Sequence, residues 1–225
     1  MFHLIRIRGL VNYQEGLKLQ EKAYEIVERG DSEGILFILE HQPVFTVGMG
    51  GGRENLLLQE SEIQGRGYQV VDINRGGNIT FHGPGQIVAY PIFNLTYLKK
   101  DVHWFVNSLE DTVIKTLEEY GIEGTRKKEY KGVWIKDVKV AALGIHAKRW
   151  ITTHGISFNV NVDKNAFKLI TPCGIKDFAV GNLTDYDNDI DIEDVKNKLE
   201  TAIEAVFKVH FVNTQLNDMD TEVIK

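Results

Sequence analysis

The sequence predicts an α+β fold in which a mixed or antiparallel sheet is flanked by helices. Expected strands outnumber expected helices, and many of these strands are joined by short turns, which is typical of this class. The 225 residues contain no internal repeat, low-complexity segment or linker rich in proline and serine. We therefore expect a single domain over residues 1–225, ending in an acidic tail from about residue 211.

Three segments carry the 3.6-residue apolar period of a helix. The first begins at Asn12, a good N-cap, and ends at Arg29, where Gly30 is placed to terminate it. The second is expected over residues 101–120 and the third over about residues 192–208. Each of these helices has one apolar side that is available for packing.

Shorter apolar runs bounded by turn residues predict strands. The run at the N-terminus alternates and carries arginines, so it is typical of a strand and not of a signal peptide. In chain order, the expected strands cover residues 1–8, 35–39, 44–47, 68–73, 87–93, 132–135, 139–145 and 156–162.

The composition is that of a soluble globular protein, with 43% hydrophobic and 26% charged residues. A mean hydropathy of -0.21 and the lack of a long apolar run argue against a membrane span, and without an export signal we expect a cytoplasmic location. The net charge of -6 argues against a nucleic-acid partner. The basic stretch 126–131 is a local exception. It is either a solvated face or a docking patch for an acidic protein.

The segment Arg75–Gln86 is the most informative one in the sequence. Its glycines are interleaved with polar side chains between two apolar strands, which suits a backbone that comes close to a ligand. No Gly-Lys-Ser/Thr follows, so it is not a phosphate-binding P-loop. A tight turn whose glycines only satisfy geometry explains it as well. For the glycine-rich segment 48–53 we expect a mobile surface loop that serves as a flap over a site.

Cys173 is the only cysteine, so the chain forms no internal disulfide. It lies between Pro172 and Gly174, and a rigid loop thiol of this kind suits a nucleophile. The alternative is a buried cysteine that acts as a small hydrophobic residue. One cysteine and scattered histidines give no ligand spacing for a metal, and a Ser-His-Asp triad lacks its Gly-x-Ser-x-Gly elbow.

A thiol needs a base, because only a small fraction is thiolate at neutral pH. The candidates are Lys139, His82, His146 and His154. Lys139 opens an apolar strand. If it points into a pocket, desolvation lowers its pKa and a neighbouring thiolate raises it, so it would exchange one proton. The alternative is an exposed lysine at a strand end.

Together these segments resemble the octanoyltransferases of lipoate biosynthesis, the octanoyl-[acyl-carrier-protein]:protein N-octanoyltransferases. The similarity covers most of the chain, and the segment Arg75–Gln86 is highly specific. The other matching segments, in the order of the family, are residues 41–48, 54–57, 139–144, 154–160 and 172–175. The chain departs from the family at residues 181–184, where relatives usually have a Thr-Ser-Leu type of sequence.

The resemblance implies that Cys173 forms an acyl-thioester and that Lys139 tunes it. It implies the fold of biotin and lipoate protein ligase catalytic domains. It also implies that the following residues bind the substrate: Arg75, Gly76, Gly77, Asn78, Ile79, Thr80, Phe81, His82, Ala142, Leu143, Gly144, Gly155, Ile156 and Ser157.

The implied reaction moves an octanoyl group from octanoyl-acyl carrier protein to a lysine of lipoyl domains, as the first step of protein lipoylation. The acceptors would be E2 subunits of 2-oxoacid dehydrogenases and the H protein of glycine cleavage. We expect a monomer that needs no ATP or metal, since phosphopantetheine arrives on the acyl carrier protein. Two alternatives are an ATP-dependent lipoate or biotin ligase, which needs no thiol, and a non-catalytic acyl-carrier-binding module with a structural cysteine.

Overall fold

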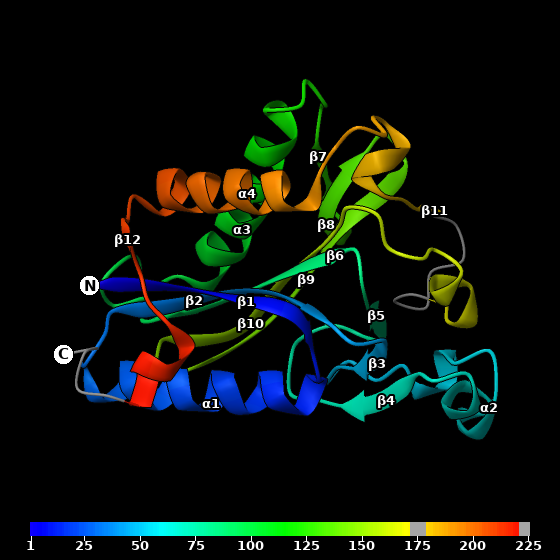
Figure 1. Cartoon of the computed structure of the whole chain (residues 1–225), viewed down its shortest axis with the longest axis horizontal. Coiled ribbons are helices and arrows are strands. Elements are labelled where there is room, and N and C mark those ends of the chain that lie inside the picture. The colour runs from blue at the N-terminus through cyan, green and yellow to red at the C-terminus, as the bar shows by residue number, and fades with distance from the viewer. Residues whose placement is uncertain (172–178, 221–225) are drawn as a thin grey trace.

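The computed structural model describes residues 1–171 and 179–220, and it confirms the α+β class: a mixed sheet lies between helices (Figure 1). Within the described residues the larger sheet has nine strands. Eight follow one another across it in this order: β12 (Phe211–Asn213), β1 (Phe2–Val11), β2 (Gly34–His41), β6 (Gln86–Phe93), β10 (Ile151–Asn159), β9 (Val138–Lys148), β8 (Tyr130–Ile135) and β7 (Thr125–Lys127). The ninth, β11 (Ala179–Val180), pairs with β9.

The larger sheet is mixed because β1 is parallel to both of its neighbours, and β11 is parallel to β9. The remaining neighbours are antiparallel. A smaller sheet has the order β4 (Gln69–Asp72), β3 (Val44–Val47) and β5 (Thr80–His82). The short helix α2 (Glu60–Gly65) precedes β4, and single 3-10 turns occupy Arg53–Asn55, Ala166–Leu169, Leu183–Asp185 and Leu216–Asp220.

Three long helices cover the two faces of the larger sheet (Figure 1). Helix α1 (Tyr13–Arg29) packs on one face, and α3 (Val102–Glu118) and α4 (Ile192–Phe207) pack on the other. Successive side chains of a strand point to opposite faces, so a strand in this position is apolar on both sides. On β2, Leu36 and Ile38 join the core under α3 and α4, whereas Phe37 joins the core under α1.

The predicted starts of the three long helices and the end of the first are confirmed by their caps, whereas α3 ends at Glu118, two residues before the predicted end. Asn12 accepts a hydrogen bond from the Gln14 amide, and Gly30 ends α1 in the left-handed conformation with a φ of 84°. Asp101 caps α3 in the same way, and Asp191 caps α4.

Strand β10 begins at Ile151, five residues before the strand predicted from residue 156. The sequence hides this part of the strand because it is polar. Thr152 is nevertheless fully buried, and its hydroxyl donates to the carbonyl of Pro91 on the neighbouring strand. The short elements α2, β5 and β7 were not predicted either, because three to six residues are too few to show a period.

The expected acidic tail takes part in the fold over its described residues. Phe211 to Asn213 pair with β1 as strand β12, and Met219 is buried in the core under α1. None of the helices in the described ranges is both long and apolar enough to cross a lipid bilayer.

Candidate active site

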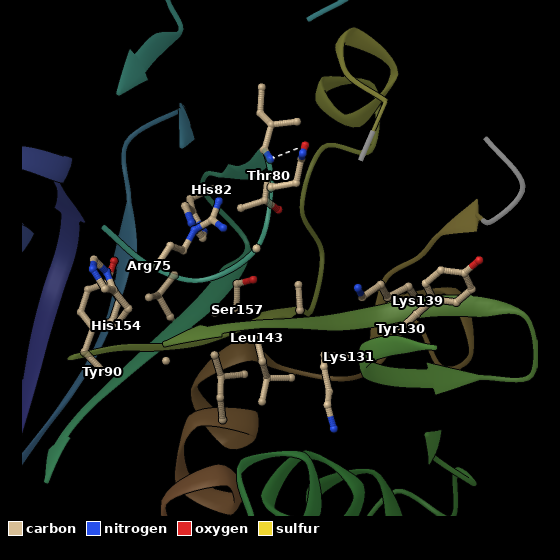
Figure 2. A pocket seen from close by; sticks show the side chains of 18 of the residues that line it. Arg75, Thr80, His82, Tyr90, Tyr130, Lys131, Lys139, Leu143, His154 and Ser157 are labelled. Atoms are coloured by element: carbon tan, nitrogen blue, oxygen red, sulfur yellow. Dashed lines mark hydrogen bonds between the residues drawn. The ribbon is translucent and has the colours of Figure 1, made fainter. Parts of the chain in front are cut away.

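A cavity of about 420 Å³ lies where the loop 75–79 and β5 meet strands β6, β8, β9 and β10 (Figure 2). Its lining includes Lys139 and twelve of the fourteen residues that the resemblance assigns to substrate binding: Arg75, Gly77, Asn78, Ile79, Thr80, His82, Ala142, Leu143, Gly144, Gly155, Ile156 and Ser157. Figure 2 shows Lys139 and Tyr130 at one end of this cavity, and His154 and Tyr90 at the other.

The pairing of β9 with β10 brings two distant segments of sequence together. Gly144 is the partner of Gly155, and Ala142 is the partner of Ser157. These residues share one side of the strands, whereas Leu143 points to the other side (Figure 2), where it packs against the core under α3 and α4. The cavity wall along these strands therefore presents small side chains.

Two predicted binding residues do not line the cavity. Gly76 makes backbone interactions: its amide donates to the Ile145 carbonyl, and its carbonyl accepts from Arg75. Phe81 is buried beneath the smaller sheet, where its ring lies 5.3 Å from that of Phe45 and 5.5 Å from that of Phe167.

Arg75 is a buried cation in the cavity wall, with only 7% of its surface exposed. One terminal nitrogen donates to the Thr46 carbonyl at 2.7 Å and to its hydroxyl at 2.9 Å, and the other donates to the carbonyl of Gly76. A guanidinium held by three acceptors in this way has a fixed position.

The loop 48–53, predicted to be a flap, lies behind the cavity wall. The Met49 amide donates to the Arg75 carbonyl and the Gly50 amide to the Gly77 carbonyl, each at 2.9 Å. A Cβ at Gly48 would lie 2.4 Å from the Gly77 carbonyl oxygen, so only glycine permits this approach. Among the described residues that line the cavity, none comes from this loop.

Aromatic and imidazole side chains close the end of the cavity opposite Lys139. His41 lies just behind it and contacts the Tyr90 hydroxyl through Nε2 at 2.7 Å. Burial lowers the pKa of His41 to about 4, and burial together with the nearby His41 lowers the pKa of His82 to about 3. Burial raises the pKa of Tyr13 to about 12. These side chains are therefore neutral at physiological pH.

His154 belongs to this closed end. Its Nε2 lies 2.7 Å from Oδ1 of Asn74, and its backbone amide donates to Oε1 of Gln20. Burial, with a further contribution from the charge on Arg75, lowers the pKa of His154 to about 4. His146, the remaining histidine among the candidate bases, lies on β9 but lines a separate groove.

Lys139 lies at the other end and is 9% exposed, so the structure excludes the exposed strand-end alternative. Its Nζ lies 5.5 Å from the centre of the buried Trp134 ring. Lys139 and Ala141 pair with the consecutive residues Trp134 and Val133, so Val140 is an extra residue on β9. Such bulges re-aim side chains next to active sites, and this one brings Lys139 to the cavity.

Cys173 lies outside the described residues, but both flanks of its segment are described. On one side, the Thr171 amide donates to the Asn55 carbonyl, and the Asn55 amide group donates to Oδ1 of the cavity residue Asn78. On the other side, Val180 pairs with Lys139. Both flanks are therefore attached to the cavity wall.

Six further residues line the cavity without having been predicted: Tyr13, Val88, Tyr90, Glu129, Tyr130 and Lys131. They come from α1, β6 and the β7–β8 hairpin. Apart from the basic stretch 126–131, to which the three hairpin residues belong, nothing in their local sequence distinguishes them from ordinary core or surface positions. The basic stretch 126–131 borders the same end as Lys139. Two cations of this stretch form salt bridges with carboxylates elsewhere in the chain, Arg126 with Glu110 and Lys127 with Asp137.

Comparison with known proteins identifies the family. Residues 12–204 match the family described as Lipoyl protein ligase A/B catalytic domain. The chain is 50% identical over 210 residues to the octanoyltransferase of Thermoanaerobacter sp. strain X514. This alignment covers 93% of this chain and 92% of that protein. It is 42% identical over 209 residues to the octanoyltransferase of Clostridium kluyveri, with 93% and 90% covered. The chain belongs to the octanoyltransferase family. It is thus an acyltransferase.

Two solved structures show how widely the octanoyltransferase fold is shared. A putative lipoate protein ligase from T. acidophilum superposes with a TM-score of 0.73 at 14% identity, covering 100% of this chain and 92% of that one. The biotin protein ligase of Aquifex aeolicus superposes with a TM-score of 0.55 at 19% identity, covering 92% and 70%. At these identities both similarities concern the fold alone. They confirm the expected fold of lipoate and biotin protein ligase catalytic domains.

Proposed function

We propose that this octanoyltransferase takes the octanoyl group from octanoyl-acyl carrier protein onto Cys173 and passes it to a lysine of a lipoyl domain. The observation that carries this proposal is the attachment of both flanks of the Cys173 segment to the cavity wall. Thr171 is connected through Asn55 to Asn78, and Val180 pairs with Lys139 itself. These two attachments support a nucleophile from this segment that acts together with the buried lysine.

The chemistry needs two acyl transfers. In the first, Lys139 accepts the thiol proton, the Cys173 sulfur attacks the thioester carbonyl carbon, and the phosphopantetheine thiolate leaves and takes up that proton. In the second, the amine of the acceptor lysine attacks the new thioester. Its proton passes through Lys139 to the departing Cys173 sulfur, and an amide bond forms. Because the incoming acyl group is already activated as a thioester, neither ATP nor a metal ion is required.

The cavity suits an unbranched acyl chain. Its wall along β9 and β10 consists of Ala142, Gly144, Gly155 and Ser157, which leave room above the strands. Apolar Val88 adds to the lining. Each methylene buried here contributes about 0.8 kcal/mol to binding. Leu143 and Ile156 also line the cavity, and they pack into the core under α3 and α4, which supports this part of the wall.

A second feature supports an acidic protein as the donor. Lys128 and Lys131 are exposed on the hairpin that borders the Lys139 end, and Lys131 donates only to the neutral side-chain oxygen of Asn107 among the hydrogen bonds described for it. Acyl carrier proteins and lipoyl domains are acidic, so these lysines attract both partners. We propose that a monomer serves both in turn.

The test is a mass measurement on the intact protein. Incubation with octanoyl-acyl carrier protein without ATP should add one octanoyl group, and Cys173→Ser should not acquire it. Transfer onto an apo lipoyl domain should follow in a second incubation. If the chain instead modifies the lipoyl domain only from free octanoate and ATP, with Cys173→Ser still active, it is a ligase and the proposal fails. Binding of acyl carrier protein without any adduct would identify a non-catalytic module.

A further inference from the structure

Two hollows in the molecule share one side chain. The first is the cavity described above, and the second is a groove of about 330 Å³ between α1 and the β9–β10 hairpin. The groove is lined from α1 by Leu17, Gln20, Glu21, Tyr24 and Glu25, and from the hairpin by His146, Lys148 and Thr153. His154 lines both hollows.

The backbone of His154 is unusual in a way that explains its position. Side chains alternate along a strand, so His154 should point to the same side as Ile156, into the core under α3 and α4. Its Nε2 contacts Oδ1 of Asn74 instead, and it lines the same groove on the α1 side as its neighbour Thr153. Its φ of 59° lies in the left-handed region and breaks the alternation. Such a conformation is costly for a residue other than glycine and is held in place by its surroundings.

The strained backbone puts an imidazole between the two hollows. The side chain is 3% exposed, and the contact of Nε2 with Asn74 fixes its orientation. Its ring centre lies 6.4 Å from that of Tyr90, which also lines the cavity. His154 and Asn74 thus form a partition, with the cavity on one side and the groove on the other.

The distance between Lys139 and the partition limits the length of an acyl chain that fits between them. His154 pairs with Ile145, six positions along β9 from Lys139. Because Val140 is an extra residue in the bulge, the separation corresponds to five regular steps, or roughly 17 Å at ~3.3 Å per residue. An extended eight-carbon chain, with bonds of about 1.5 Å, spans roughly 9 Å. The Lys139 side chain and the thioester occupy part of the remaining length. An octanoyl chain therefore ends before the partition, whereas a chain longer by four to six carbons meets it.

We propose that His154, held by Asn74, closes the acyl cavity and limits the length of the acyl chain that the enzyme accepts. This inference rests on the acyl transfer proposed above and adds a specificity-determining residue to it. Removal of the imidazole joins the cavity to the groove, where Leu17 and Tyr24 offer apolar surface to a longer chain.

The experiment compares acyl carrier proteins loaded with chains of 8, 10, 12 and 14 carbons. The wild-type enzyme should lose kcat/KM steeply beyond ten carbons. His154→Gly is the opening variant, because glycine adopts the positive φ without strain. It should raise the ratio of kcat/KM for 12 carbons to that for 8 carbons at least tenfold. Damage to the fold would lower both values and leave the ratio unchanged.

Two further variants complete the test. Asn74→Ala removes the contact that holds the imidazole and leaves the strained backbone in place, so the ratio should rise by a smaller factor, and this variant decides the outcome if His154→Gly does not fold. His146→Ala changes a histidine that lines only the groove and should keep the wild-type ratio. An unchanged ratio in both partition variants, with octanoyl transfer intact, overturns the inference. If the wild-type enzyme fails to transfer the octanoyl group from acyl carrier protein at all, the proposed function itself has failed.

Discussion

Gly132 leaves open the space through which the side chain of Lys139 reaches the cavity. A Cβ at position 132 would lie 2.4 Å from the Ala141 carbonyl oxygen, and 2.5 Å from Cε and 3.2 Å from Nζ of Lys139. Gly132 has a φ of 133°, and its amide donates to Oε1 of Glu110 at 2.9 Å. The buried Glu110 carboxylate on α3 thereby fixes the backbone beside Lys139.

We expect Gly132→Ala to lower kcat for octanoyl transfer at least tenfold with a small change in KM. The new methyl group meets the Ala141 carbonyl oxygen as well as Lys139, so it shifts β9 together with Lys139, and a small misplacement of a catalytic group strongly reduces the rate. Steady-state kinetics with octanoyl-acyl carrier protein measure the effect. The control is Gly121→Ala, which also has a positive φ of 67° but no atom within 4 Å of the added Cβ. Equal losses in the two variants would attribute the effect to backbone strain.

Replacing Glu110 should destabilise the fold. Its side chain is 2% exposed, and it accepts from Gly132 and from Nε of Arg126 at 2.9 Å. Glu110→Ala leaves both donors without this partner, which costs about 1–3 kcal/mol of unfolding free energy. Urea unfolding gives the value. Asp111→Ala removes a half-exposed carboxylate that pairs with the same arginine and should cost less than about 1 kcal/mol. Similar costs would argue against a special role of Glu110.

Lys139 should control the reactivity of Cys173. In Lys139→Met, the midpoint of the pH dependence of Cys173 alkylation should rise by about 1–3 units, since a nearby cation stabilises the thiolate. Adduct formation should slow by about 10²–10⁴, as for the loss of a general base. Lys127→Met is the matched control, because Lys127 lies over the same Trp134 ring at 4.6 Å but does not line the cavity among the described residues. A thiol that reacts identically in Lys139→Met would exclude the pair.

Buried neutral histidines make the fold sensitive to acid. The pKa values of His41 and His154 are lowered to about 4 and that of His82 to about 3, whereas an unfolded chain titrates near 6.5. The unfolded chain therefore binds more protons below pH 6.5. The contribution of each neutral histidine to the free energy of unfolding is complete above pH 6.5. It falls as the pH drops to about 4, by up to ~1.4 kcal/mol per pH unit for each histidine.

Urea titrations at pH 7, 6, 5 and 4.5 measure this slope. His82→Gln should show a shallower slope than wild type, because one group that takes up a proton on unfolding is gone. His210→Gln is the control, since the His210 side chain is 98% exposed. A wild-type slope in His82→Gln would show that this imidazole does not contribute.

Charge reversal should reveal the docking surface. Lys128→Glu with Lys131→Glu should raise KM for octanoyl-acyl carrier protein several-fold at low salt and flatten its dependence on ionic strength. Reversal of two exposed lysines outside the cavity lining, Lys18 and Lys115, serves as the control. The proposal fails if both double variants behave alike.

The sequence by itself determined the fold class, the three long helices and the family. Helix ends follow from local chemistry, since caps such as Asn12 and Gly30 act on backbone groups a few residues away. The segments that carry the resemblance are also local, and twelve of their predicted binding residues line one cavity.

Only the tertiary structure decided how these segments meet and what surrounds them. The bulge at Val140 aims Lys139, Glu110 supports it from a helix, and the left-handed backbone of His154 divides the cavity from the groove. His154 is held there by Asn74 and Gln20, which lie 80 and 134 positions away in the sequence. Contacts over such separations leave no periodic trace, because their free energy comes from burial and hydrogen bonds that exist only in the folded chain.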